Sequence, residues 1–118
     1  DIPAIRWIPQ PAGYLTTRWL TCFTLAGADA TARCDALMRS MERHSIEVRP
    51  VWKPMHLQPL FHNAPYFPHA EGADVSRRLF ETGVCLPSGS NLSEEQQDRV
   101  IAHLRRVLSQ PEDRRALV

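Results

Sequence analysis

The pattern of apolar and polar positions along the chain predicts three strands and three helices. Residues 17–25 (TRWLTCFTL) are rich in β-branched and aromatic residues and apolar on both alternating sides, which is typical of a covered strand. Residues 46–52 (IEVRPVW) alternate as a second strand, and Pro50 within them favours the edge of a sheet. Residues 84–89 (VCLPSG) predict a short third strand that Pro87 ends.

The first predicted helix covers roughly residues 30–44. Asp29 stands in the N-cap position, where a short polar side chain can accept a hydrogen bond from the first turn. Apolar residues at i, i+3, i+4 and i+7 give this segment one face that can be buried. These residues are Cys34, Leu37, Met38 and Met41.

A second, shorter helix is predicted over residues 73–82. Its apolar residues Val75, Leu79 and Phe80 lie at helical spacing, and we expect them to face inward. Gly83 follows the helix, and glycine is the residue type that most often ends one.

The last helix has the clearest local pattern in the chain. Ser93 and Gln96 form a capping box of the S-x-x-Q type, and two glutamates in the first turn lie where the helix dipole favours negative charge. Pro111 is predicted to end the helix. The predicted inward stripe consists of Val100, Ile101, Leu104, Val107 and Leu108.

These elements predict an α+β fold, a small two-layer domain with about three strands and with the helices packed on one face of the sheet. Residues 1–15, which contain Pro3, Pro9 and Pro11, predict an extended segment that links to a preceding large domain, and residues 16–118 predict the small domain itself. The chain does not begin with methionine, and we expect it to be a piece of a longer polypeptide.

Composition narrows the class of protein without naming a function. The 118 residues are 43% hydrophobic and 23% charged, as expected for one soluble globular domain. A net charge of +1 gives no general attraction to nucleic acid or to a membrane surface, and no apolar run has the length of a membrane span. Cys22, Cys34 and Cys85 have no C-x-x-C spacing and are predicted to be buried small hydrophobic residues in a reducing cytoplasm.

Residues 47–60 (EVRPVWKPMHLQPL) form an unusual segment, which we call the extended segment. Pro50, Pro54 and Pro59 exclude both a helix and a central strand, so the backbone is stiff and presents side chains alternately to two sides. The connection continues to residue 72, and its large apolar content predicts an ordered loop that packs against another surface.

Three stretches resemble the C-terminal region of the DegT/DnrJ/EryC1/StrS family of pyridoxal-phosphate-dependent sugar aminotransferases. RPVWKPMHLQPLF (49–61) is similar to the family pattern R-P-x-W-x-P-x-H-x-x-P. GVCLPSGSNLSEEQQDRVI (83–101) is similar to a short L-P strand followed by L-T/S-x-E/D-x-Q at the last helix. TTRWLTCFTL (16–25) resembles an upstream strand, and the resemblance extends over about residues 5–110.

The resemblance implies the small domain of a fold type I aminotransferase. It implies a homodimeric enzyme that moves an amino group, with glutamate as donor, to a nucleotide-linked 4-keto sugar. The products would be bacillosamine- or perosamine-type sugars for surface glycans and glycoproteins. In the family, the lysine that holds pyridoxal phosphate lies upstream of the matched region. Lys53, the single lysine of this chain, does not match that position, so we expect the chain alone to be inactive and to bind no cofactor.

The extended segment carries the predicted substrate-binding residues. These are Arg49, Trp52, Lys53, His56 and Gln58. We expect the four polar side chains to face the nucleotide sugar, whose diphosphate and hydroxyl groups need cationic and hydrogen-bonding partners. Trp52 is expected to pack beneath them or to border the sugar. For Arg49 and Trp52, a structural role in fixing the segment to the domain stays open.

The loop aromatic residues have a separate predicted role. We expect Phe61, Tyr66 and Phe67 to contact the large domain or a second subunit, because so much apolar surface is seldom left exposed.

Three other functions are open at this point. His56, His62 and His69, with Cys85 further along, could form a metal site, although their spacing fits no common motif. The aromatic strand could belong to a non-enzymatic α/β module that binds nucleic acid, although the charge is low for that role. A family member that dehydrates the sugar would differ at the upstream lysine, which this chain does not contain.

Overall fold

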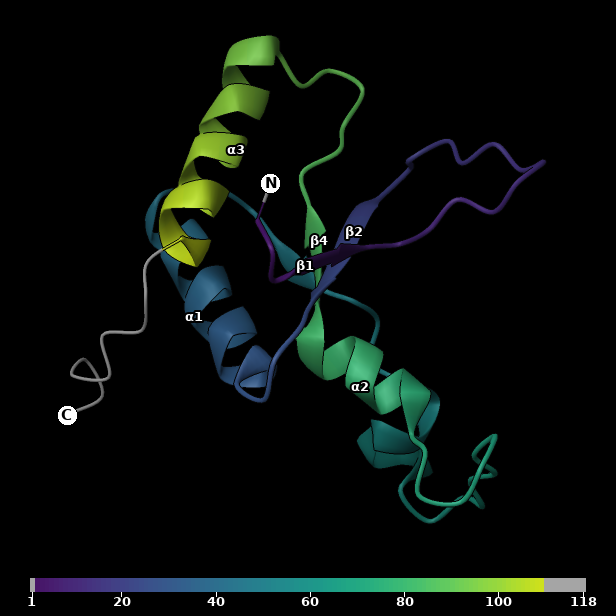
Figure 1. Ribbon diagram of the computed structural model, residues 1–118. Coiled ribbons are helices and arrows are strands. Elements are labelled where there is room, and N and C mark those ends of the chain that lie inside the picture. Colours follow the sequence, from purple (N-terminus) through teal and green to yellow (C-terminus); the bar gives the residue numbers. More distant parts are fainter. Residues whose placement is uncertain (1, 110–118) are drawn as a thin grey trace, which may run out of the picture.

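The computed structural model describes residues 2–109, and within that range it contains a four-stranded sheet and three α-helices (Figure 1). The strands are β1 (Ile5–Trp7), β2 (Thr21–Leu25), β3 (Arg49–Pro50) and β4 (Gly83–Leu86). The helices are α1 (Ala30–Arg43), α2 (Val75–Thr82) and α3 (Glu94–Leu108), with two short 3-10 helices, η1 (Met55–Leu57) and η2 (Pro59–Phe61). The prediction that the prolines of the extended segment exclude any helix is wrong, because Pro54 caps η1 and Pro59 begins η2, positions where a missing N–H costs nothing. The strand order is β1-β2-β4-β3, and every neighbouring pair is antiparallel.

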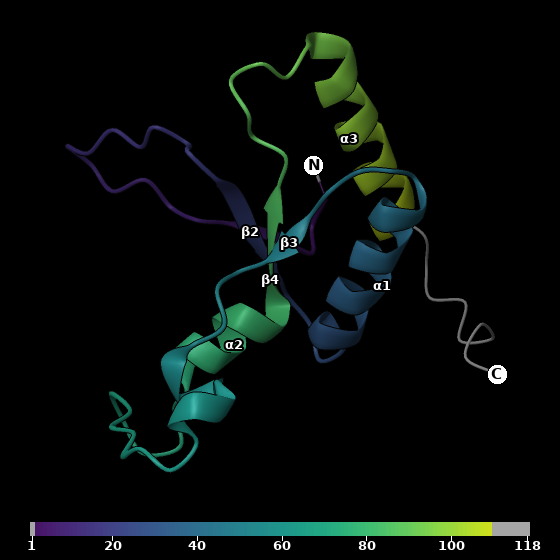
Figure 2. The same ribbon diagram turned by 180° about the vertical axis from the view of Figure 1, so that it is seen from behind.

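Helices α1 and α3 lie on one side of the sheet, and the two opposite views agree on this arrangement (Figures 1 and 2). Phe23 of β2 and Val84 of β4 are register partners that point to this side and are fully buried. Because side chains alternate along a strand, their neighbours Cys22 and Cys85 point to the opposite face, which we call the open face. The α+β class with helices on one face of a sheet is confirmed.

The buried core lies between the sheet and these two helices. It contains residues of β1, β2 and β4 packed against the inward stripes of α1 and α3. Ile46, which follows α1, is also part of it. The core cluster is Ile5, Phe23, Leu25, Ala30, Cys34, Leu37, Met41, Ile46, Val84, Leu86, Val100, Leu104 and Leu108.

The sheet has one strand more than the sequence predicted. Strand β1 lies within residues 1–15, which were expected to be extended, and it pairs with β2 through Ile5 opposite Leu25 and Trp7 opposite Phe23. Three residues are too few to show strand periodicity, so no pattern of apolar positions predicts this strand. Residues 8–20 connect β1 to β2 and project away from the sheet as an arm (Figure 1).

Two strands are shorter than predicted. Strand β2 begins at Thr21 instead of residue 17, because Arg18 has a φ of 52°, in the left-handed region, which interrupts extended pairing. Strand β3 comprises two residues of the predicted 46–52, and it occupies the edge of the sheet as Pro50 predicted.

Helix α1 confirms the predicted stripe, with Cys34, Leu37 and Met41 buried and Met38 half-buried. Asp29 occupies the N-cap position without a side-chain capping bond, and its carboxylate lies 3.8 Å from the Arg33 guanidinium. Helix α1 ends because Ser45, the residue after the C-cap, adopts a left-handed φ. Its N–H donates back to the carbonyl oxygen of Glu42 in the helix.

The prediction that Val75 and Leu79 face inward is wrong. Their exposed fractions are 45% and 38%, because α2 extends past the end of the sheet and has no buried residue (Figure 1). Gly83 does end the helix, but with an extended φ of −104°. Glycine is needed at this position because there is no room for a side chain. A Cβ on residue 83 would lie 2.3 Å from the Leu79 carbonyl oxygen and 2.6 Å from Cγ2 of Val51.

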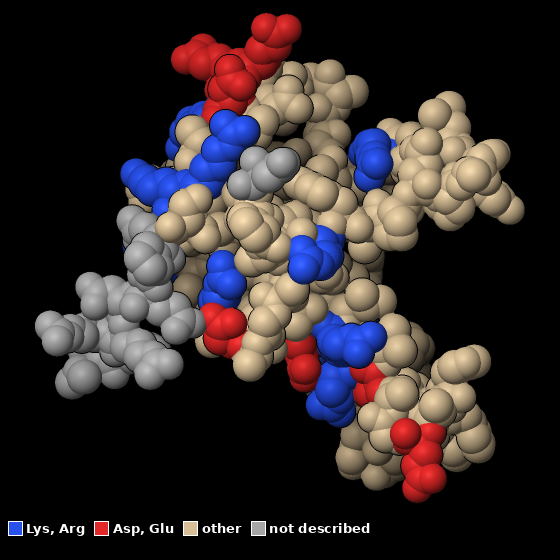
Figure 3. Space-filling model, in the orientation of Figure 1, with Lys and Arg blue, Asp and Glu red and all other residues tan. Residues whose placement is uncertain are grey.

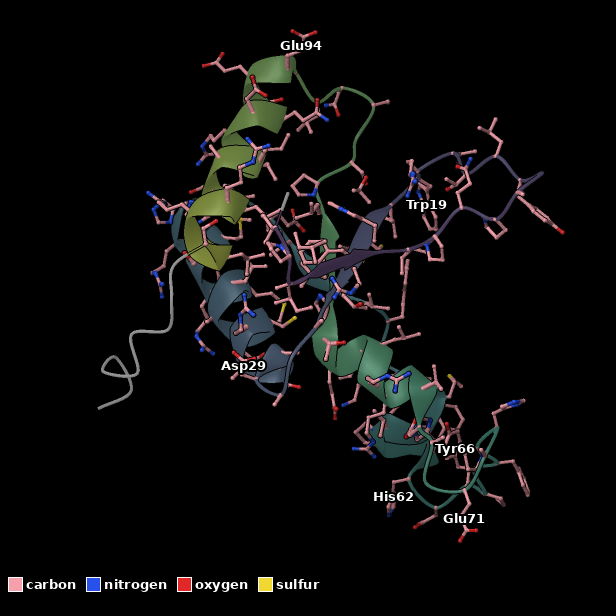
Figure 4. All side chains as sticks on the ribbon, viewed as in Figure 1. Trp19, Asp29, His62, Tyr66, Glu71 and Glu94 are labelled. Carbon is pink, nitrogen blue, oxygen red and sulfur yellow. The ribbon has the colours of Figure 1, made fainter. Side chains whose placement is uncertain are left out.

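Helix α3 begins at the predicted capping box. The Gln96 N–H donates to Ser93 Oγ at 3.2 Å, and the Ser93 N–H donates to Gln96 Oε1 at 2.9 Å. Acidic side chains gather at this end of the helix, where Glu94 lies (Figures 3 and 4). The stripe is confirmed with Ile101 and Val107 half-buried. The predicted stop at Pro111 lies outside the described residues.

None of the helices within residues 2–109 has both the length and the apolar character needed to cross a membrane.

Candidate functional site

A cavity of about 1240 Å³ lies on the open face of the sheet. Its floor includes Arg49 of β3 and Cys85 of β4, which are register partners. Its walls are the end of the arm (residues 17–20), the extended segment as far as Lys53, and the last residue of β4 with the chain that follows it (residues 86–90). Antiparallel pairing therefore brings together three segments that are far apart in the sequence.

Two tryptophans stand beside each other in this cavity. The ring centroids of Trp19, from the arm, and Trp52, from the extended segment, are 6.1 Å apart, with the rings tilted by 33°. The hydroxyl of Ser88 donates to the Trp19 carbonyl oxygen at 2.9 Å, which ties the arm to the chain after β4. Figure 4 shows Trp19 where the arm leaves the sheet. Both residues are exposed, at 74% and 65%, so they offer aromatic surface to a planar or ring-shaped ligand.

Three cationic side chains line the same cavity. Lys53 makes no hydrogen bond or ion pair through its ammonium group with any residue in the range 2–109, and Arg18 bonds only through its backbone. Arg49 is held by Glu47, whose carboxylate accepts from Nε at 2.9 Å and from a terminal nitrogen at 2.6 Å. The unpaired cations make the cavity attractive to an anionic group.

The structure brings together three of the five predicted substrate-binding residues. Arg49, Trp52 and Lys53 line the cavity, whereas His56 and Gln58 do not. Gln58 instead donates from Nε2 to the Lys53 carbonyl oxygen at 3.1 Å, so it fixes the backbone next to the cavity.

His56 is the centre of a separate hydrogen-bonded cluster. Its Nε2 lies 2.7 Å from Oδ2 of Asp74, and its ring stacks on that of Tyr66, with centroids 3.7 Å apart. The Tyr66 hydroxyl donates to Oδ1 of Asp74 at 3.1 Å, and the same oxygen accepts the Arg77 N–H at the start of α2. The cluster fastens the loop to α2, and Figure 4 shows Tyr66 lying beside that helix.

The protonation of Asp74 follows from these contacts. Burial raises the pKa of its carboxyl, but the hydrogen bonds from the Arg77 N–H and from His56, Tyr66 and Ser76 outweigh it and hold the pKa well below its ordinary value. Asp74 is therefore ionised at neutral pH and accepts all these bonds as a carboxylate.

Arg18 and Trp19 are the cavity residues that sequence reasoning missed. The alternation of apolar residues predicted that both lie in a covered strand. Instead the left-handed φ of Arg18 turns them out of the sheet, and no sequence pattern predicts that φ. Non-glycine residues in that region are uncommon and cost roughly 1 kcal/mol.

The cavity does not fit a covalently held pyridoxal phosphate. Such a cofactor needs a carboxylate for its ring nitrogen, and Glu47, the one carboxylate among the described residues that line this cavity, is already bonded to Arg49. Among residues 2–109, no first turn of an α-helix lines this cavity to hold a phosphate. Within residues 2–109, no group of three or more His, Cys, Asp or Glu side chains is placed to hold a metal ion.

Comparison with known proteins gives the family. Residues 4–105 match the DegT/DnrJ/EryC1/StrS aminotransferase family. The chain belongs to this family. It is 42% identical over 100 residues to EpsN of Bacillus subtilis, which is named as a pyridoxal phosphate-dependent aminotransferase, and the match covers 85% of the chain and 25% of EpsN. It is 32% identical over 108 residues to the GDP-perosamine synthase of Caulobacter vibrioides, covering 86% of the chain and 27% of that protein.

Solved structures of aminotransferases have the same fold. The aminotransferase TlmJ of Streptoalloteichus hindustanus superposes with a TM-score of 0.74 at 21% identity, over 92% of this chain and 27% of TlmJ. A family member from Brucella abortus gives a TM-score of 0.71 at 23% identity, also over 92% and 27%. This chain spans about a quarter of the length of the curated relatives it matches.

Proposed function

We propose that this chain is the small C-terminal domain of a pyridoxal-phosphate-dependent sugar aminotransferase, and that its open face forms one wall of the nucleotide-sugar site. Residues 1–15 connect it to a large domain, with β1 built into the sheet on the way, and residues 16–118 complete the small domain. Membership of the DegT/DnrJ/EryC1/StrS family supports the reaction class. The relative named GDP-perosamine synthase supports a nucleotide-linked sugar as substrate.

The cavity on the open face carries this proposal. A nucleotide sugar presents a diphosphate next to a planar base and a sugar ring. The cavity has matching groups, with Arg18 and Lys53 for the diphosphate and the indole faces of Trp19 and Trp52 for a ring. Arg49, oriented by Glu47, adds a third donor at the floor.

His56 and Gln58 act on the substrate through the backbone of the extended segment. Gln58 holds the carbonyl of Lys53, and His56 anchors the following loop to Asp74. Both residues thereby fix the position of Lys53 and Trp52 before substrate arrives, which lowers the entropy lost on binding.

The reacting groups are supplied from outside this chain. We place the lysine that holds the cofactor, and the carboxylate and phosphate-binding groups, in the large domain, since the cavity here does not fit the cofactor. The isolated chain is then inactive, and the full-length enzyme is cytoplasmic and uses glutamate to aminate a nucleotide-linked 4-keto sugar for glycan or glycoprotein synthesis.

The exposed apolar residues support a homodimer with a large domain packed against the loop. Leu60 and Phe67 are 85% and 87% exposed, and Tyr14 and Leu15 of the arm are 73% and 88% exposed. Large apolar side chains that are exposed close to one another mark contacts with other protein. Light scattering of the full-length protein is expected to give a dimer, and a strict monomer at high concentration would contradict it.

The reaction is tested with the full-length protein. Purified with pyridoxal phosphate, it is incubated with glutamate and a nucleotide-linked 4-keto sugar, and the products are weighed by mass spectrometry. We expect a 4-amino sugar nucleotide and one equivalent of 2-oxoglutarate. Loss of water from the sugar without incorporation of nitrogen would replace the proposal with a dehydratase. Amination by the isolated 118-residue chain would overturn the division of roles between the domains.

A further inference from the structure

Cys22 and Cys85 meet across the pairing of β2 and β4. They are direct register partners, and their Sγ atoms lie 3.2 Å apart. Residues directly opposite in an antiparallel pair have Cα atoms about 4.5–5.5 Å apart, which is within the range that a disulfide can bridge. Bond formation requires the two sulfur atoms to approach by about 1 Å more, and side-chain rotation can supply this.

The surroundings single out this pair among the three cysteines. Both side chains lie on the open face, where Cys85 forms part of the cavity floor and Cys22 is half-buried. Cys34 is buried on the other side of the sheet, where its thiol donates to the Thr82 carbonyl oxygen at 3.1 Å. The fold therefore allows one pairing and separates the third thiol from it.

We propose that Cys22 and Cys85 form a reversible thiol–disulfide site at the floor of the cavity, oxidised by a hydroperoxide. The thiol of Cys22 gives up its proton, the thiolate attacks a peroxide oxygen, and the O–O bond breaks. The leaving hydroxide takes up that proton, so hydrogen peroxide yields a sulfenic acid and one water. The sulfur of Cys85 then attacks the sulfur of Cys22, and the S–O bond breaks with release of a second water. Two thiols and one peroxide thus give one disulfide and two waters, and a dithiol reverses the change.

The two thiols differ in exposure and in protonation, and both differences favour oxidation of Cys22 before Cys85 attacks it. Cys22 is the more exposed of the pair, so a peroxide reaches it first. Burial, together with the adjacent thiol of Cys22, raises the pKa of Cys85 to about 12, so Cys85 stays protonated until its partner has been oxidised. Its proton passes to the departing hydroxide as the sulfur–sulfur bond forms, which gives the second water.

The disulfide would close a loop that contains α1, β3 and α2, because it joins β2 to β4. A cross-link over so long a loop removes freedom from the unfolded chain and stabilises the folded one. Cys85 is also the register partner of Arg49, so the cross-link lies directly beside a charged group of the cavity. The inference rests only on the β2–β4 register and does not require the proposed substrate.

The test is peptide mapping of the native full-length protein after treatment with hydrogen peroxide. Remaining thiols are blocked with N-ethylmaleimide, and the protein is digested with trypsin without reduction. Cleavage after arginine places the three cysteines in separate peptides, 19–33, 34–39 and 79–99. We expect one cross-linked pair, 19–33 with 79–99, lighter by about 2 Da than the sum of the peptides and lost on treatment with dithiothreitol.

Substitutions make the result specific. Cys34→Ser should keep the cross-link, and Cys22→Ser and Cys85→Ser should each abolish it. Oxidation should raise the unfolding temperature of the wild-type protein and of Cys34→Ser and leave that of Cys22→Ser unchanged. Recovery of Cys22 as a sulfinic acid without any cross-link would overturn the proposal. The proposal would also be overturned if the folded protein formed the same mixture of disulfide pairings as the protein oxidised in urea.

Discussion

The rings of His56 and Tyr66 are stacked, with centroids 3.7 Å apart and an angle of 12° between their planes. Both side chains also bond to the carboxylate of Asp74, which caps α2. One carboxylate therefore joins the extended segment, the loop that follows it and the start of a helix.

Replacing His56 with alanine is expected to loosen the loop. The substitution removes the stacked ring and leaves Oδ2 of Asp74 without its shortest bond, at 2.7 Å. We expect the unfolding temperature to fall by about 5 °C, the shift that one lost hydrogen bond gives in a domain of this size. Thermal unfolding followed by circular dichroism measures this.

His62→Ala is the matched control for that substitution. His62 lies nearby in the same loop but is exposed, and its ring makes one contact, 3.3 Å to the Pro59 carbonyl oxygen. Its unfolding temperature should stay within about 1 °C of the wild type. Equal effects of the two substitutions would show that the cluster around Asp74 does not hold the loop.

His103 makes the stability of the domain depend on pH. It is buried between α1 and α3, where Nε2 lies 3.1 Å from Ser40 Oγ and Nδ1 accepts from Arg106 at 2.6 Å. Burial lowers the pKa of His103, and the charges of His44, Arg106 and Arg99 lower it further. Protons then bind more readily to the unfolded state, so stability is lost as the pH falls through the ordinary histidine value of about 6.5.

The pH effect is measured by comparing His103→Gln with the wild type. Glutamine can still hydrogen-bond to Ser40 but carries no titrating proton. The wild-type unfolding temperature should fall between about pH 7.5 and about pH 5.5, and that of His103→Gln should fall less over the same interval. Parallel curves for the two proteins would contradict the role assigned to His103.

Gly83→Ala is expected to destabilise the junction between α2 and β4. The new methyl group would meet the Leu79 carbonyl oxygen and the side chain of Val51, neither of which can move freely. A loss of about 1–3 kcal/mol in the free energy of unfolding follows from overpacking. Gly89→Ala is the control, because its Cβ would meet only the end of the Asn91 side chain. Urea denaturation of both variants checks this, and equal losses would contradict it.

Features set by short-range chemistry could be predicted from the sequence. Ser93 and Gln96 form their capping box within one turn, so four residues are enough to specify it. Pro50 has no backbone N–H to donate to a neighbouring strand, so the edge position of β3 follows from this one residue. The buried stripe of α1 could be predicted from the helical spacing of its apolar residues alone.

Features set by pairing between distant segments could not be predicted. The contact of Trp19 with Trp52 depends on the order β2-β4-β3 and on the backbone turn at Arg18. The same register brings Cys22 opposite Cys85, although their spacing in the sequence carries no motif. His56 was expected at the substrate, but its partner Asp74 lies across a loop whose path the sequence does not specify.

The central claim is that the open face of this sheet binds the nucleotide sugar. It is tested by steady-state kinetics of the full-length enzyme carrying Trp52→Ala, with Trp7→Phe as control, since Trp7 packs edge-on against Phe23 on the other face. A lost aromatic stacking contact should raise the KM for the nucleotide sugar about tenfold, with kcat little changed and with Trp7→Phe at the wild-type value. An unchanged KM in Trp52→Ala, with the protein folded, would contradict the account.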